Sequence, residues 1–237
     1  MSLVATEAPR LSSLIKHEYE PSVGYCRDVV TVYEASGKTY PIGTVLGKTF
    51  VSSSVTATAG TNTGNGAIGT VTATGLAKNG IYTIRIVKAA SNAGDFTVID
   101  PSGAVIGYGT VAVAYSNQIA FTLADGATDF VVGDTFTVEV IGTYKYKLIE
   151  ATATDGSRDF AAIYLSASDG SFSTSTIAAT TNTSVIALVN GAAVVGKSAL
   201  TVGASVDTAG ELARLYGQME AKGIIVRDQL GSFPVVA

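Results

Sequence analysis

The sequence predicts a mainly β fold with a minor α component. Three observations lead to this prediction. Glycine is abundant, with 26 copies in 237 residues, while charged residues make up only 14% and tryptophan is absent. Turn-forming residues recur at roughly the spacing of 8 to 12 residues that is typical of β-sandwiches and barrels. Only one stretch, near the C-terminal end, has clear helical periodicity.

The chain changes character twice. Up to Lys48 it reads as strands joined by short turns, with "DVVTVY" from Asp28 and "TYPIGTVLG" from Thr39, in which Pro41 lies near a strand start where a missing N–H is tolerated. From Thr49 it becomes rich in Thr, Gly and Ala, and the earlier style returns near Tyr144. We therefore predict one domain, 28–48 plus 144–237, interrupted by an inserted domain, 49–143.

The inserted segment is predicted to be an independent β-sandwich of about seven strands. In "GIYTIRIVKAA", apolar residues alternate with polar ones, which buries one face of a strand. "DPSG" has Asp100, Pro101 and Gly103 at positions that suit a type I turn. The residues expected in its core are Tyr82, Ile84, Ile86, Ile119, Phe121, Leu123, Phe136, Val138 and Val140.

The C-terminal part contains a predicted hairpin and the one predicted helix. Asn190-Gly191 is expected to join two adjacent strands, because this dipeptide favours hairpin turns. In "DTAGELARLYGQMEAKG", Thr208 and Glu211 form a capping-box pattern, and Gly223 is expected to end the helix. The apolar stripe of this helix is Leu212, Leu215, Tyr216 and Met219.

The residues do not suggest an enzyme. His17 is the only histidine and Cys26 the only cysteine, so neither a base–nucleophile pair in a pocket nor an internal disulfide is expected. "GNGAIG", from Gly64 to Gly69, matches a dinucleotide-binding fingerprint in letters, but no helix follows to bind phosphate. A loop is the better interpretation of this segment, and no cofactor is expected.

A metal ion is not expected either. Asp125, Asp129 and Asp134 cluster in one segment, and three carboxylates at loop tips offer oxygen ligands to calcium. Their spacing does not match an EF-hand, and polar turn residues of a β domain are the preferred interpretation.

Net charge and hydropathy limit the classes of partner that the sequence suggests. The net charge is −4 with no basic stripe, so direct nucleic-acid binding is not expected. No segment is long and apolar enough to predict a membrane-spanning helix, and the first residues do not resemble a signal peptide. We therefore expect a protein that is made in the cytoplasm and joins an assembly.

The segments on either side of the insert resemble head decoration proteins of tailed phages, of the phage lambda type. The resemblance lies in "CRDVVTV" (26–32), "GKTYPIGTVLGK" (37–48), "YKLIEATATDGSRDFAAIYLSAS" (146–168) and "VIALVNGAAVV" (185–195), which occur in the family's order. It implies a β-clip-like decoration domain. The insert is similar to the immunoglobulin-like β domain that recurs within such proteins.

This resemblance implies a structural function. A cement protein of this kind binds, as a homotrimer, the outer face of the expanded capsid in the virion, and it stabilises the head against internal DNA pressure. Its partner is the major capsid protein. Residues 1–27 correspond to the family's capsid-binding arm, and we expect that deleting residues 1–24 leaves a folded trimer without capsid binding. The candidate contact residues in the arm are Leu11, Leu14, Ile15, His17, Tyr19 and Tyr25.

An alternative function follows from the insert. Its strand pattern is that of a surface-displayed binding module, for which a host-surface glycan is the expected partner. The absence of tryptophan argues against sugar binding, because aromatic rings are the usual platforms for sugars.

Overall fold

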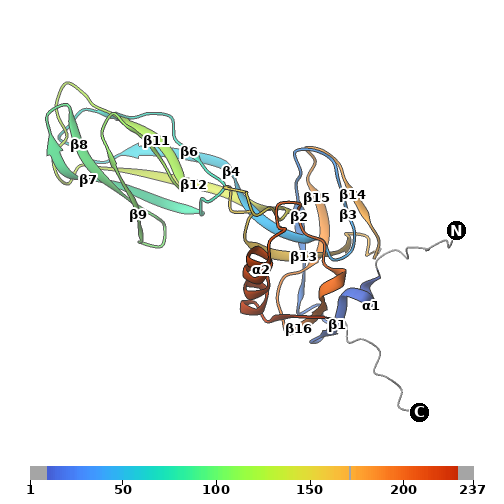
Figure 1. Ribbon diagram of the computed structural model, residues 1–237. Coiled ribbons are helices and arrows are strands. Elements are labelled where there is room, and N and C mark those ends of the chain that lie inside the picture. Colours follow the sequence, from blue (N-terminus) through green and yellow to red (C-terminus); the bar gives the residue numbers. More distant parts are fainter. Residues whose placement is uncertain (1–9, 171, 229–237) are drawn as a thin grey trace, which may run out of the picture. The chain divides into compact units, whose positions relative to one another are not determined.

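The computed structural model describes residues 10–170 and 172–228, and in these the fold is mainly β (Figure 1). Two α-helices and one 3-10 helix accompany the strands in this part of the chain. The predicted fold class is confirmed at this level.

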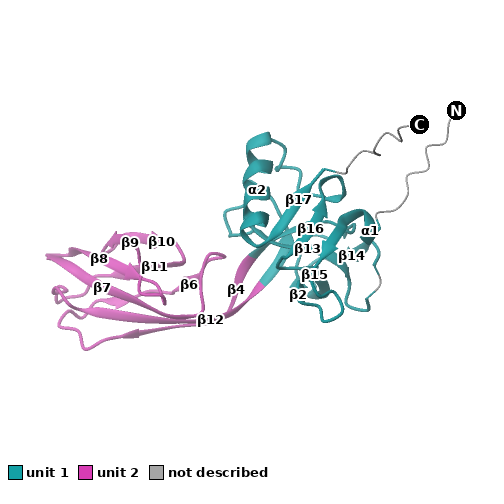
Figure 2. Ribbon diagram, turned by 90° about the horizontal axis from the view of Figure 1, so that it is seen from below, with its two compact units in different colours: residues 1–48, 145–237 teal, residues 49–144 magenta. Residues whose placement is uncertain are grey.

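The chain divides into two compact units (Figure 2). Unit 1 consists of residues 1–48 and 145–237, and unit 2 of residues 49–144. The prediction from sequence placed the second boundary one residue earlier. Both boundaries fall inside long strands, β4 (Val45–Ala59) and β12 (Thr135–Leu148).

Unit 1 is built around a ring of five strands. The strands follow the order β2-β15-β13-β4-β12, and a parallel pairing of Tyr146 with Val32 closes β12 onto β2. The ring is thus a small mixed β-barrel. Its strands contribute Val, Leu, Ala and Tyr residues to one core cluster, in which Tyr164 and Leu46 are fully buried. Besides β4 and β12, the barrel contains β2 (Arg27–Val32), β13 (Phe160–Ala167) and β15 (Thr183–Leu188).

A second, three-stranded sheet and a helix cover another core in unit 1. The sheet order is β1-β16-β17, with β1 antiparallel and β17 parallel to β16. Helix α2 contributes Leu215 and Met219 to the same core as Leu14 and Val195. The remaining elements of unit 1 are α1 (Leu11–Leu14), β1 (Ile15–Glu18), β3 (Lys38–Tyr40), β14 (Ser175–Ile177), β16 (Ala193–Gly196), η1 (Lys197–Ala199), α2 (Ala209–Ala221) and β17 (Ile224–Arg227).

The predicted helix is confirmed in detail. Both hydrogen bonds of the capping box between Thr208 and Glu211 are present, and they satisfy backbone N–H groups of the first turn. Leu215 and Met219 are buried and Leu212 and Tyr216 partly buried, as the apolar stripe predicts.

The hairpin predicted at Asn190-Gly191 is wrong. Strands β15 and β16 belong to different sheets and do not pair. The glycine instead serves close packing, since its N–H donates to the Lys222 carbonyl and an added Cβ would lie 1.8 Å from the Gly223 oxygen. This segment leads the chain from the barrel to the end of α2. The Asn-Gly dipeptide, which favours a tight turn, does not indicate this long-range packing.

Unit 2 contains two sheets that share one core. The first continues through β12, β7, β8 and β9, and the second is formed by β10, β11, β5 and β6. Every residue predicted from sequence for this core is buried in it, which confirms the alternation that predicted them. The elements are β5 (Ala67–Ile68), β6 (Thr72–Ala73), β7 (Gly80–Ala90), β8 (Ala93–Ile99), β9 (Val105–Thr110), β10 (Ala114–Ser116) and β11 (Ile119–Ala124).

Aspartates hold loops of unit 2 through hydrogen bonds. Asp134 accepts hydrogen bonds from the N–H groups of Thr63, Gly64 and Val131, at 2.9 to 3.1 Å. The glycine-rich "GNGAIG" segment therefore begins as a loop tied to this buried carboxylate at Gly64, and its Ala67 and Ile68 form the short strand β5. Asp100 likewise closes the predicted turn, where the Gly103 N–H donates to the Asp100 carbonyl at 2.9 Å.

Candidate functional site

The N-terminal segment is folded onto unit 1 from residue 10 onward. Leu14 is fully buried, with 0% of its surface exposed, and Leu11 and Ile15 pack against the same core. Strand β1 pairs with β16 through Ile15, His17 and Glu18. The expectation of an arm that is free from its own domain therefore does not hold for residues 10–27. The part of the predicted arm from residue 1 to 9 lies outside the described residues.

A buried ion pair fixes the end of this segment. The guanidinium of Arg27 donates two hydrogen bonds to the carboxylate of Glu18, from Nε at 2.8 Å and from Nη2 at 2.5 Å. Only 3% of the Glu18 side chain is exposed. Such a bidentate pair has a defined geometry, so it orients the chain between Glu18 and Arg27.

Exposed aromatic residues neighbour this ion pair, in sequence at Tyr19 and Tyr25 and in space at Phe172. Tyr19 and Tyr25 pack edge to face with ring centroids 5.5 Å apart, yet 52% and 60% of their surfaces are exposed. The Arg27 guanidinium lies 5.8 Å from the centroid of the exposed Phe172 ring. We call Tyr19, Tyr25, Arg27 and Phe172 the tyrosine surface.

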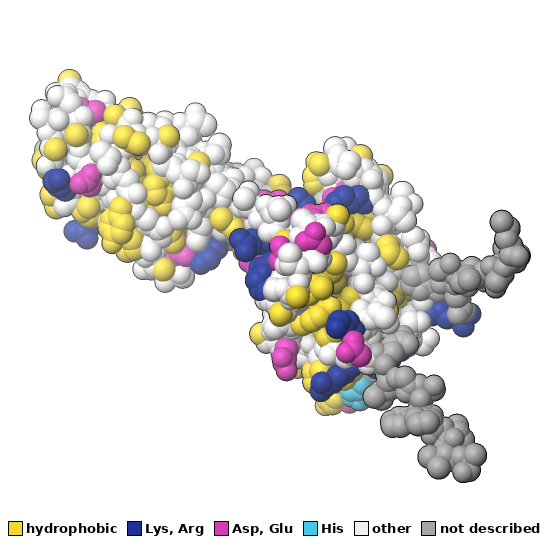
Figure 3. Space-filling model, in the orientation of Figure 1, with side chains coloured by type: hydrophobic (Ala, Val, Ile, Leu, Met, Phe, Trp, Pro, Cys, Tyr) yellow, Lys and Arg dark blue, Asp and Glu magenta, His cyan; other side chains and the backbone are white. Residues whose placement is uncertain are grey.

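A shallow hollow of about 370 Å³ adjoins the tyrosine surface. His17 and Lys16 project from β1 at its rim and are exposed, and the histidine is visible in Figure 3 in cyan. Leu11, Ile15 and Pro21 contribute its apolar lining. The hollow and the tyrosine surface share Arg27, so together they form one candidate interface.

The composition of this interface suits protein binding. Tyr, Phe and Arg are enriched at protein–protein interfaces, where rigid aromatic side chains bury large areas at a small entropic cost. Five of the six candidate residues from sequence lie on it, namely Leu11, Ile15, His17, Tyr19 and Tyr25. Leu14 does not, because its side chain belongs to the core. Sequence reasoning missed Glu18, Arg27 and Phe172.

The Cys26 side chain is buried in unit 1, whereas the His17 side chain is exposed. The Cys26 thiol is buried, with its Sγ 3.7 Å from the carbonyl oxygens of Tyr19 and Ala192. Burial raises the pKa of this thiol, and the nearby Glu18 carboxylate raises it further. A thiol in such surroundings stays protonated and inert.

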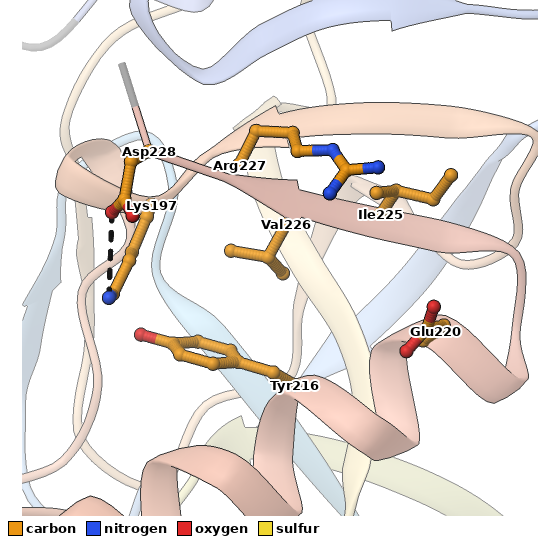
Figure 4. Close-up of a pocket in the computed structure, with 7 residues that line it drawn as sticks. All are labelled: Lys197, Tyr216, Glu220, Ile225, Val226, Arg227 and Asp228. Atoms are coloured by element: carbon orange, nitrogen blue, oxygen red, sulfur yellow. Dashed lines mark ion pairs between the residues drawn. The ribbon is translucent and has the colours of Figure 1, made fainter. Parts of the chain in front are cut away.

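A second, polar hollow of about 200 Å³ lies beside β17 (Figure 4). The Lys197 ammonium is 3.5 Å from the Asp228 carboxylate and 5.8 Å from the Tyr216 ring centroid. Arg227 and Glu220 add one charge of each sign. Because its charges balance, this hollow selects neither an anion nor a cation.

The described residues contain no group of three or more His, Cys, Asp or Glu side chains that could hold a metal ion. Among the same residues, no helix is long and apolar enough to span a membrane.

Comparison with known proteins identifies no family. No family model and no curated protein match the chain. Among solved structures, FlgL from Xanthomonas campestris matches in two crystal forms, with 21% identity and a TM-score of 0.31. The match covers 44% of this chain and 33–34% of the FlgL chain, so it spans about a third of that protein's length.

Proposed function

We propose that this chain is a head decoration protein, a viral cement protein that binds the outer face of an expanded capsid as a homotrimer. Unit 1 is the β-clip-like decoration domain in this proposal, and unit 2 is an inserted immunoglobulin-like β-sandwich. The protein acts by binding alone and carries out no reaction.

The barrel of unit 1 is the observation that supports this proposal most. The four segments that resemble the decoration family are scattered between residues 26 and 195, on both sides of the insert. Each of the five barrel strands draws on one of these segments, and β2 lies wholly within the first. Motifs that are distant in sequence thus share one structural element, as expected if they were inherited together.

The tyrosine surface and its hollow are the proposed contact with the major capsid protein. The Glu18–Arg27 ion pair holds Tyr19 and Tyr25 in place before binding, which lowers the entropy lost on association. An aromatic surface of this kind accepts an apolar side chain or a strand from the partner. The proposed interface therefore lies on a preformed part of unit 1.

Stabilisation follows from mass action. A trimer that binds only the expanded lattice lowers its free energy by about 2.7 kcal/mol per site when free protein is at 100 times its Kd. Selectivity for the expanded state requires contacts that exist only there. Summed over many sites, this differential binding opposes rupture of the head.

Two measurements test the proposal. Light scattering after size-exclusion chromatography is expected to give about three times the 24.1 kDa chain mass, and a monomer at micromolar concentration contradicts the trimer. Heads assembled from the capsid protein of the same phage are expected to bind the purified chain after expansion and not before it. Equal sedimentation with both kinds of head, or with neither, contradicts the proposed function.

Variants then locate the contact. Tyr25→Ala is expected to weaken binding to expanded heads by about tenfold or more, since a central aromatic residue often contributes at least 1–2 kcal/mol. Val105→Ala, an exposed substitution in unit 2, is the matched control. Unchanged binding by both Tyr19→Ala and Tyr25→Ala would place the capsid contact elsewhere.

A further inference from the structure

We propose that the outward face of strands β7, β8 and β9 in unit 2 is a binding site for an acidic saccharide, with Tyr108 and Arg85 as its principal contacts. This site is separate from the proposed capsid contact, because every residue that forms it lies in unit 2.

Three side chains form a row across the strands. Arg85 of β7 is paired with Thr97 of β8, and Thr97 is paired with Tyr108 of β9. Their neighbours Ile84, Ile86, Phe96 and Val98 are buried in the core, so the row points to the opposite face. Because adjacent strands lie about 4.8 Å apart, Arg85 and Tyr108 stand roughly 10 Å apart with Thr97 between them.

Tyr108 is an isolated aromatic platform. It is 74% exposed, the most exposed large apolar residue among those described. Its neighbours Gly107 and Gly109 have no side chains, because Tyr115 and Phe96 fill the space on the inward side. Because most of its surface is exposed, the Tyr108 ring is free to pack against the C–H face of a sugar.

Thr97 forms the floor between the two ends of the row. Only 9% of its surface is exposed, although it points outward, so the longer side chains beside it shield it. The row therefore offers mainly its two ends, Arg85 and Tyr108, to a ligand.

Arg85 supplies an uncompensated positive charge. It makes no ion pair or hydrogen bond with the described part of the chain, and its side chain is exposed. The charged groups in the hollow beside Tyr108 are Lys88 and Asp95, which pair with each other at 3.6 Å. The local balance is therefore positive, and a planar guanidinium favours a carboxylate through two parallel hydrogen bonds.

A hollow next to Tyr108 provides further polar groups. Its volume is about 410 Å³, within the range of small-ligand sites, and it is lined by Val87, Lys88, Asp95, Tyr108, Gly109 and Thr110. Thr110 donates to the Asp95 carboxylate at 3.1 Å. A carboxylate acceptor and an ammonium donor side by side suit vicinal hydroxyl groups, which both donate and accept hydrogen bonds.

The combination favours a sugar over a peptide or nucleic acid. A peptide strand would need a series of pockets for alternate side chains, whereas this is a single hollow in which an ammonium, a carboxylate and a hydroxyl lie beside one aromatic ring and one valine. Nucleic acid would need several cations along its backbone, and the face in view of Figure 3 carries few charged side chains in unit 2. An acidic saccharide needs one cation, one ring and hydroxyl partners.

The test uses the full chain on an array of uronic-acid and sialic-acid glycans with their uncharged counterparts, followed by calorimetric titration with oligogalacturonate and its methyl ester. We expect binding of acidic members and loss of binding on esterification. Arg85→Ala and Tyr108→Ala are each expected to weaken binding about tenfold or more, as loss of a charged hydrogen bond or a stacked ring does. Glu139→Ala, on the same sheet, is the control.

Three results overturn the proposal: no acidic glycan bound by the array, equal binding of charged and esterified sugar, or full affinity in both variants. Preferential binding of an acidic peptide over every glycan also overturns it. The variants are expected to keep wild-type thermal unfolding, which separates loss of binding from loss of fold. Capsid binding and trimer mass do not enter this experiment, so its failure leaves the proposed function unaffected.

Discussion

The rings of Phe50 and Tyr144 pack edge to face, with their centroids 5.5 Å apart, although they stand at opposite ends of unit 2 in the sequence. Ser53 Oγ donates to the Ile141 carbonyl one step further into the unit. In unit 1, the Ile149 N–H donates to the Val45 carbonyl at 3.1 Å. Each unit therefore holds its own two junction segments side by side.

This arrangement predicts that the two units fold separately. Replacing residues 49–144 by an Asn-Gly turn is expected to leave unit 1 folded, because the strands it joins are already neighbours and this dipeptide suits a tight hairpin. Residues 49–144 alone are expected to unfold cooperatively, since their core is their own. Circular dichroism during thermal unfolding checks both. Loss of a cooperative transition in either fragment contradicts the prediction.

Gly47, in the "GTVLG" motif, is predicted to tolerate no side chain. A Cβ at this position would lie 1.9 Å from the Ser157 carbonyl oxygen, so the backbone would have to move. Gly47→Ala is expected to lower the free energy of unfolding by about 3 kcal/mol. Gly217→Ala, on the exposed side of α2 with open space around it, is expected to raise it by up to about 1 kcal/mol. Urea denaturation measures both, and equal effects would contradict this account.

Glu34 is predicted to be a key polar residue of the barrel. Its buried carboxylate accepts hydrogen bonds from the Tyr40 hydroxyl and from the Leu148 N–H, the latter at 2.8 Å. Glu34→Ala leaves both donors without an acceptor, which is expected to cost about 2–4 kcal/mol of unfolding free energy. Hydrogen exchange at the Leu148 amide is expected to accelerate. Tyr33→Phe, at an exposed ring, is the control and is expected to change neither quantity.

Asp134 is predicted to make the stability of unit 2 depend on acid pH. Burial alone would raise the pKa of this carboxyl, but hydrogen bonds from the N–H groups of Thr63, Gly64 and Val131 outweigh burial and lower it. A lowered pKa in the folded state stabilises the fold above the unfolded value, near 3.9, and this contribution is lost as pH falls through the folded value.

The measurement is a urea midpoint at several pH values. The wild type is expected to exceed Asp134→Asn most above about pH 5, and the difference is expected to shrink as pH falls below about 3. Glu139→Gln, at an exposed position in the same unit, is expected to follow the wild-type profile. A difference between wild type and Asp134→Asn that is constant with pH would contradict the role given to the charge.

Sequence patterns correctly predicted those helices and strands that are determined by residues close together in the sequence. The α2 helix follows from its cap and stripe, and β7 follows from alternation of Tyr82, Ile84 and Ile86. The prediction of a hairpin at 190–191 was wrong because Gly191 packs against the backbone of Gly223. No residue near Gly191 in the sequence indicates this contact.

The candidate interface was predicted only in part, for the same reason. The polar composition of the N-terminal segment suggested an arm, whereas one leucine, Leu14, and the pairing of β1 with β16 fold it onto unit 1. Phe172 joins Arg27 across the fold, a contact without any sequence signal. Deleting residues 1–24 would therefore remove part of the unit 1 core, so single substitutions at Tyr19 and Tyr25 test the contact more cleanly.

The sheet β1-β16-β17 has a consequence for synthesis on the ribosome. It joins residues 15–18 to residues 193–196 and 224–227, so it cannot be completed until residue 227 has emerged. Unit 2 is continuous in sequence and is free to fold while the rest is still being translated. Its early folding would draw Lys48 and Lys145 together and replace a loop of nearly a hundred residues by a short one. The insert then acts as an internal chaperone, because it lowers the entropy that unit 1 must lose to close its barrel.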